Sequence, residues 1–224
     1  QDAPVADQAS ARDPTRHAAH LVRVLKDFRD YFGPLLKARA KAPQNDLLTV
    51  IAQARIAGKP IPELEAISYL LILATAGHHT TSSAIAGGAW ALCERPEQFR
   101  KVVDDRSLVP GLVEEAVRWT SPVQHFMRTA AEDCELGGQQ IKAGDWLMIN
   151  YVAANHDPAQ FPDPRRFDAA RSPNRHLAFG AGAHQCLGLH LARLEMKILF
   201  EAILDRVAAV EPAGAAARAS STFV

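Results

Sequence analysis

The chain has few cysteines, no excess of charge of either sign and no long apolar run, and each shortage excludes a class of protein. Its three cysteines, Cys93, Cys134 and Cys186, are odd in number and widely spaced among 224 residues. They therefore indicate no disulfide framework, and they favour a reducing, cytoplasmic location. Lys and Arg number 25, as do Asp and Glu. This balance argues against nucleic acid or a membrane surface as the principal partner.

The missing hydrophobic runs exclude a membrane span. The longest run, residues 67–76, is interrupted by Ser68 and Thr75 and is too short to cross a bilayer. The first residues, Gln1–Ala18, lack the apolar core of a signal peptide. We therefore expect a soluble protein without a membrane segment, in which residues 1–14 form a mobile polar lead-in.

Apolar spacing predicts a mainly helical fold with a small antiparallel β component. Helices are expected over residues 17–40, from a cap at Asn45 or Asp46 as far as Gly58, and over 62–95, 96–103 and 109–119. Alternation between Cys134 and Tyr151, with turns at Gly137-Gly138 and Gly144-Asp145, predicts a hairpin. Residues 155–175 read as loop, and a last helix is expected to begin at Cys186.

The middle of the long helix over residues 62–95 is a poor helix former. Its sequence, ATAGHHTTSSA, combines Gly77 with two histidines and four hydroxyl residues. A long helix with such a centre indicates that something lies against it. The alternative is a tight helix crossing that simply tolerates small residues.

A glycine-rich loop, Phe-Gly-x-Gly-x-His-x-Cys-x-Gly, runs from Phe179 to Gly188. Cys186 is expected in the first turn of the helix that follows, whose predicted apolar face is Leu187, Leu191, Leu194 and Ile198. Unpaired N–H groups in a helix's first turn favour a thiolate over a thiol. Glycines let a flat ligand approach the backbone, so the loop suits an iron porphyrin with a sulfur ligand. The alternatives are a structural cysteine and a zinc site from His184, Cys186 and His190, which lacks a second ligand pair.

This loop resembles the haem-binding signature of the cytochrome P450 family of haem-thiolate monooxygenases. Glu115 and Arg118 match the family's Glu-x-x-Arg pair, although such a pair read alone is an ordinary surface ion pair. The resemblance implies that the pair is buried and tied to an arginine of the loop before the cysteine. Arg166 is the best match for that arginine, with Arg165 as the alternative. The third match is 76–81, which resembles the family's oxygen-binding groove.

The resemblance implies a role for each matching residue. Cys186 would bind the haem iron, Gly77 would leave space for dioxygen, and the Thr80 hydroxyl would pass protons to it. His79 stands where most similar members carry an acid, and our hypothesis is that it tunes proton delivery. The remaining expected haem contacts are Ala76, Arg128, Phe179, Gly180, His184 and Gly188, with Arg128 and His184 on the propionates. The expected substrate-lining residues, which alone would read as core, are Ile72, Leu73, Ala76, Val123, Gln124, His125 and Phe126.

Within the family, the sequence looks most like the soluble bacterial branch that hydroxylates terpineol. This likeness implies a small apolar, terpenoid-type substrate and a ferredoxin-type electron donor on the cysteine side. Four arginines near that side supply either a docking patch or a solvated loop: Arg165, Arg166, Arg171 and Arg175.

Family members are about twice as long as this chain. We therefore expect residues 15–224 to be a single helical haem-thiolate domain, the C-terminal half of the fold, without the N-terminal half and the last strand pair. Two hypotheses follow. The chain is the cysteine-bearing half of a monooxygenase, or it is a catalytically silent truncated relative that binds haem weakly or not at all and self-associates through uncovered apolar surface.

Overall fold

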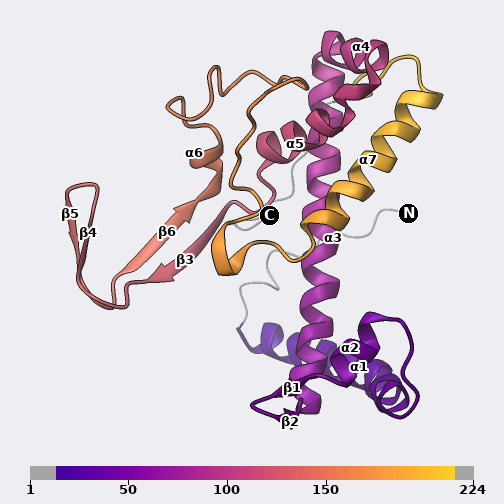
Figure 1. The fold of residues 1–224 in the computed structure, drawn as a ribbon, viewed down its shortest axis with the longest axis vertical. Coiled ribbons are helices and arrows are strands. Elements are labelled where there is room, and N and C mark those ends of the chain that lie inside the picture. Colours follow the sequence, from indigo (N-terminus) through magenta and orange to yellow (C-terminus); the bar gives the residue numbers. More distant parts are fainter. Residues whose placement is uncertain (1–13, 215–224) are drawn as a thin grey trace. The chain divides into compact units, whose positions relative to one another are not determined.

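A computed structural model describes residues 14–214, which are mainly helical with small antiparallel sheets (Figure 1). The predicted fold class is thereby confirmed. The chain divides into two compact units, residues 1–76 and 77–224. Almost all of the predicted lead-in lies outside the described residues, and the single-domain organisation stays a prediction. No helix within residues 14–214 is long and apolar enough to cross a membrane.

The first unit packs the helices α1 (Pro14–Lys41) and α2 (Leu47–Ala52) with the first turns of α3 (Glu63–Glu94). Asp46 caps α2, because its side chain accepts the Thr49 N–H at 2.7 Å. The predicted extension of α2 to Gly58 is wrong. The left-handed Gly58, at φ 77°, instead turns a hairpin of β1 (Arg55–Ile56) and β2 (Lys59–Pro60).

The second unit is built on three packed helices. The remainder of α3 lies with α5 (Val109–Thr120) and α7 (Leu189–Arg206), joined by α4 (Pro96–Asp104) and the short turn η2 (Arg106–Leu108). The predicted helices over 62–95, 96–103 and 109–119 are thus confirmed to within a residue. Their core is apolar and includes Leu92, Phe99, Leu112, Val113, Met196 and Phe200.

Helix α3 approaches its neighbours closely at two consecutive glycines. A Cβ atom on Gly88 would lie 2.6 Å from the Ala116 Cβ and 3.0 Å from the Phe200 ring. A Cβ on Gly87 would lie 2.3 Å from the Thr120 hydroxyl. Only glycine leaves enough room for this helix packing, so α3 crosses α5 here and not at its hydroxyl-rich centre.

Two glycines of α3 therefore respond oppositely to alanine. Gly88→Ala should lower the free energy of unfolding by ~1–2 kcal/mol, because overpacking outweighs the better helix propensity. Gly77→Ala should raise it by up to ~1 kcal/mol, because no atom lies within 4 Å of the added Cβ. Urea unfolding of both variants measures the difference. Equal shifts in one direction would contradict the close packing at Gly88.

The β component consists of two-stranded antiparallel sheets. Strand β3 (His125–Thr129) pairs with β6 (Trp146–Asn150). The intervening chain forms a separate hairpin of β4 (Cys134–Leu136) and β5 (Gln139–Ile141) (Figure 1). The predicted turn at Gly137-Gly138 is confirmed, with φ of 58° and 79°. The chain past Gly144 does not extend that hairpin, because β6 finds its partner in β3.

Candidate functional site

The cysteine loop follows a long irregular segment after α6 (Tyr151–Asn155) and folds back on itself. The Cys186 N–H donates to the Phe179 carbonyl, and the Gly180 N–H donates to the Leu177 carbonyl, each at 2.8 Å. Gly180 and Gly182 are left-handed, at φ 68° and 66°, and a Cβ on Gly180 would press to 3.2 Å from the His184 carbonyl oxygen. The first two glycines of the motif are therefore required by the backbone of the loop itself.

Cys186 lies outside the helix that follows it, which corrects the prediction that it occupies the first helical turn. Helix α7 begins at Leu189 with Gly188 as its cap, so the sulfur is carried by the last residues of the loop. A Cβ on Gly188 would lie in ordinary van der Waals contact with the Cys186 Sγ, at 4.0 Å. All residues of 181–188 are exposed, so nothing in the described chain covers the thiol.

The predicted apolar face of α7 is also corrected. Its four residues, Leu187, Leu191, Leu194 and Ile198, are all exposed, Leu187 by 88%. The residues that α7 buries are Leu189, Met196, Phe200 and Leu204. The helix is apolar on more than one side, and only one of these sides has a partner among the described residues. The other leaves apolar surface beside the cysteine loop, as expected for an incomplete fold.

The centre of α3 is continuous helix, exposed over residues 72–79 and buried at Thr81 and Ala84. Hydroxyl side chains bond back to the carbonyls of the preceding turn, as Ser82 does to His78 at 2.8 Å and Thr75 does to Leu71 at 2.9 Å. All residues of 72–79 are exposed, Thr80 is partly buried, and the rings of His78 and His79 lie 5.0 Å apart. Since 72–79 is exposed, the alternative of a tight crossing finds support only at the buried end of this stretch, at Thr81 and Ala84.

Glu115 and Arg118 form a fully buried ion pair on α5, as the resemblance implies. The Arg118 Nε and Nη2 atoms each donate to one carboxylate oxygen of Glu115 at 2.8 Å, and both side chains are 0% exposed. Arg118 Nη1 also donates to the carbonyls of Asn155 and Pro164, at 2.8 and 3.0 Å. The pair thus fixes the segment that leads to the cysteine loop.

The third member of this buried cluster is Arg171, so the assignment to Arg166, with Arg165 as the alternative, is wrong. Arg171 Nε lies 3.1–3.2 Å from both Glu115 oxygens, and its side chain is almost entirely buried. Arg166 contributes only its carbonyl oxygen, which accepts from Arg171 Nη2 at 2.7 Å. The turn in which the Arg171 N–H donates to the Asp168 carbonyl brings Arg171 inward.

Two asparagines that the sequence reasoning missed complete this cluster. Asn155 is fully buried; its amide donates to the Ser121 hydroxyl and its oxygen accepts the Leu177 N–H at 2.7 Å. Asn174 donates to Glu115 at 3.0 Å. Neither has a spacing signal in the sequence, since burial of a single amide depends on the path of an irregular segment.

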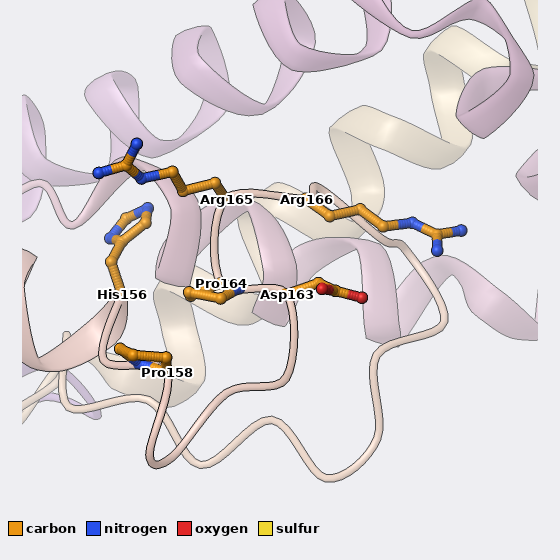
Figure 2. A pocket seen from close by; sticks show the side chains of 6 residues that line it. All are labelled: His156, Pro158, Asp163, Pro164, Arg165 and Arg166. Atoms are coloured by element: carbon orange, nitrogen blue, oxygen red, sulfur yellow. The ribbon is translucent and has the colours of Figure 1, made fainter.

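The arginines of the irregular segment divide into one buried and three exposed side chains. Arg165, Arg166 and Arg175 are exposed, whereas Arg171 is held by Glu115 and leaves the predicted docking patch. A pocket of about 590 Å³ lies in this segment. Its lining residues are drawn in Figure 2: His156, Pro158, Asp163, Pro164, Arg165 and Arg166. Burial keeps the pKa of His156 below its usual value, so the positive charge here comes from the arginines.

The donor chemistry of the loop fits a single axial ligand and not a metal cage. Among residues 14–214, no group of three His, Cys, Asp or Glu side chains could hold a metal ion, so the zinc alternative has no support. An uncovered thiol on a glycine-rich backbone leaves one side of the sulfur open to a flat, large group. The loop residues Phe179, Gly180, His184, Cys186 and Gly188 lie together, whereas Thr80 and Arg128 lie on α3 and β3.

The chain belongs to the cytochrome P450 family, whose model matches residues 5–210. Enzymes of this family use a haem iron bound by a cysteine thiolate and activate dioxygen. Cytochrome P450-terp of a Pseudomonas species is 42% identical over 222 residues, which cover 97% of this chain and 52% of that protein. The predicted likeness to the terpineol-hydroxylating branch is thereby confirmed.

Solved structures give the same fold. The crystal structure of CYP108D1 from Novosphingobium aromaticivorans is 59% identical with a TM-score of 0.84, covering 89% of this chain and 49% of that one. CYP109E1 of Bacillus megaterium, solved in complex with corticosterone, is 31% identical with a TM-score of 0.87, covering 95% and 58%. The chain therefore spans about half the length of the relatives that it matches.

Proposed function

We propose that the chain is the cysteine-bearing half of a haem-thiolate monooxygenase that hydroxylates a small apolar substrate, of terpenoid type by its likeness to P450-terp. The observation that carries the proposal is the geometry of the cysteine loop. Its backbone is closed by the bond from Cys186 N–H to the Phe179 carbonyl, and its sulfur is exposed between glycines. The Cys186 sulfur would bind the iron, and the bound haem would supply oxygen activation and transfer of one oxygen atom.

The centre of α3 has the properties that oxygen chemistry requires of a protein surface. Gly77 keeps it free of side-chain bulk, and no atom lies within 4 Å of the place that a Cβ would take there. The Thr80 hydroxyl and the exposed His79 imidazole would hold and move protons there. Ala76 would contribute a further small contact on the same helix.

His79 gives this proposal a test of its own. We expect His79→Asp to change both the coupling of oxygen consumption to product and the pH profile, because an imidazole can donate one proton and accept another whereas an ionised carboxylate can only accept. Product and oxygen are measured together over a range of pH values. His78→Asp, the same change at the neighbouring histidine, is the matched control. If His79→Asp left coupling and profile unaltered, the proton-delivery role would be refuted.

Haem and substrate would each be held by residues outside the cysteine loop. Arg128 on β3 and His184 at the end of η3 (Gly182–His184) would bind the propionates. The resemblance assigns substrate contacts to Ile72 and Leu73 on α3 and, in the other unit, to Val123, Gln124, His125 and Phe126, of which the last two begin β3. Support comes from exposed apolar side chains on both elements, among them Ile72 and Phe126.

Electrons would come from a ferredoxin-type donor that binds on the cysteine side. Arg165, Arg166 and Arg175 are exposed cations that could make such a contact. They belong to the segment that is fixed by the buried cluster of Glu115, Arg118 and Arg171, called here the Arg118 cluster. Opposite charge on the two partners would steer the encounter. A cytoplasmic location, favoured by the three free cysteines, belongs to the same proposal.

One spectrum tests the function. The chain is mixed with haemin, reduced and exposed to carbon monoxide, and an absorption band near ~450 nm reports a cysteine thiolate on the iron. Its appearance supports the proposal.

The second candidate, a catalytically silent relative that self-associates, is favoured by the exposed apolar side chains on α3 and α7, such as Tyr69 and Leu191. A chain that gives no such band after mixing with haemin, and that runs as a dimer by light scattering, would support this candidate and reject the first.

A further inference from the structure

A second charged cluster, distinct from the Arg118 cluster, holds the cysteine loop from both sides. Glu114 on α5 receives two hydrogen bonds from Arg193 on α7, from Nε at 2.6 Å and from Nη2 at 2.9 Å. The same carboxylate lies 3.1 Å from the Nε2 atom of His176, which precedes the loop. Residues on either side of Cys186 in the sequence therefore meet at one carboxylate.

His176 connects this carboxylate to the backbone of the loop. Its side chain is 2% exposed, and its Nδ1 atom accepts the Ala178 N–H at 3.3 Å. An Nδ1 atom that accepts carries no hydrogen, so Nε2 carries it and donates to Glu114. The imidazole is thus a bridge of defined tautomer between α5 and the residue before Phe179.

Phe179 passes this constraint to the cysteine. Its ring lies 5.6 Å from the His176 ring, and the Arg193 guanidinium lies over it at 4.9 Å. Its carbonyl oxygen accepts the Cys186 N–H. The cluster therefore acts on Phe179 through both His176 and Arg193.

We infer that Glu114, His176 and Arg193 form a clamp that positions Phe179 and thereby the backbone of Cys186. The inference rests on the proposed function for its purpose, which is to hold the sulfur in one place for the iron. The three are positioning residues, since none contacts the sulfur. Burial raises the pKa of Glu114, but hydrogen bonds from His176 and Arg193 outweigh it and lower that pKa to about 2, so the shared carboxylate stays ionised in mild acid.

Hydrogen exchange of the backbone amides tests the clamp without haem. In Glu114→Gln, and in His176→Leu, which keeps side-chain volume without hydrogen bonds, exchange in the peptide covering 177–187 should rise about tenfold. His176→Asn should restore part of the protection, because an asparagine oxygen can accept the N–H two residues on, as Nδ1 does. Exchange in α4 should stay the same in all three.

Asp168→Asn is the matched control. Asp168 pairs with Lys101 at 2.9 Å, and the exposed fractions of the Lys101 and Asp168 side chains, 39% and 26%, equal those of Arg193 and Glu114. This control should leave exchange over 177–187 unaltered.

Three results would overturn the clamp. These are unchanged exchange over 177–187 in Glu114→Gln, a rise of equal size throughout the chain, and an Asn variant no better protected than the Leu variant. The outcome is independent of the proposed function. If the parent chain shows no thiolate band but exchange rises locally, the clamp stands and the enzyme proposal fails. If the band is present and exchange over 177–187 is unaltered in the variants, the enzyme proposal stands and the clamp fails.

Discussion

Cys186→Ser should abolish the absorption band near ~450 nm in the reduced, carbon monoxide-treated chain, because a serine hydroxyl does not replace a thiolate as an iron ligand. No other described cysteine is placed to substitute. Cys134 lies on the β4–β5 hairpin and Cys93 on α3, away from the glycine-rich loop in sequence and in secondary structure. The loss should therefore be complete, as a difference spectrum at equal protein and haemin concentration measures.

Cys134→Ser is the control for this result, because Cys134 is exposed, as Cys186 is. It should keep the full band. A Cys186→Ser protein that still showed the band would remove the proposed ligand, and with it the assignment of the whole loop.

Glu115→Gln should lower the free energy of unfolding by ~3–5 kcal/mol, a large share of the 5–15 kcal/mol that domains possess. The neutral amide would leave Arg118 buried without a counter-charge. It would also weaken the bonds that Glu115 accepts from Asp168 N–H and Arg171, which hold the irregular segment. Urea unfolding monitored by tryptophan fluorescence measures the loss.

Alanine variants of two arginines show whether the loss of stability in Glu115→Gln comes from the buried cluster or from any change of charge in this segment. Arg171→Ala should cost ~1–3 kcal/mol, since it removes charged hydrogen bonds but leaves Glu115 paired with Arg118. Arg166→Ala should stay within ~0.5 kcal/mol, because only its backbone enters the cluster. Equal losses in the two variants would contradict the assignment of the third member to Arg171.

Most of the longer helices of this chain could be predicted from sequence because their signals are local, whereas the short α6 was not predicted. Asp46 caps α2, Pro96 starts α4, and the glycine pair turns the β4–β5 hairpin, each within a few residues. The order of motifs was also sufficient to indicate the cysteine loop and the Glu115–Arg118 pair. Both depend on residues that are neighbours in the sequence.

The errors arose where the outcome depends on distant residues. Helix α7 carries leucines on more than one side, so its periodicity could not show that Leu189 and Met196, rather than Leu187 and Leu194, face the core. The segment 157–181 has no period, so nothing local distinguishes Arg171 from Arg166. For His176, the only signal was its place just before the glycine-rich loop, which does not show that it meets a carboxylate on α5.

The reach of Glu115 along the chain also sets an order of assembly. The groups that bond to its carboxylate from outside α5 lie 53, 56 and 59 residues away in the sequence. Bringing them together requires closing a long loop before any bond is gained, whereas a helix forms from contacts a few residues apart. We therefore expect the helices to form first in refolding and the segment that carries Cys186 to be fixed late.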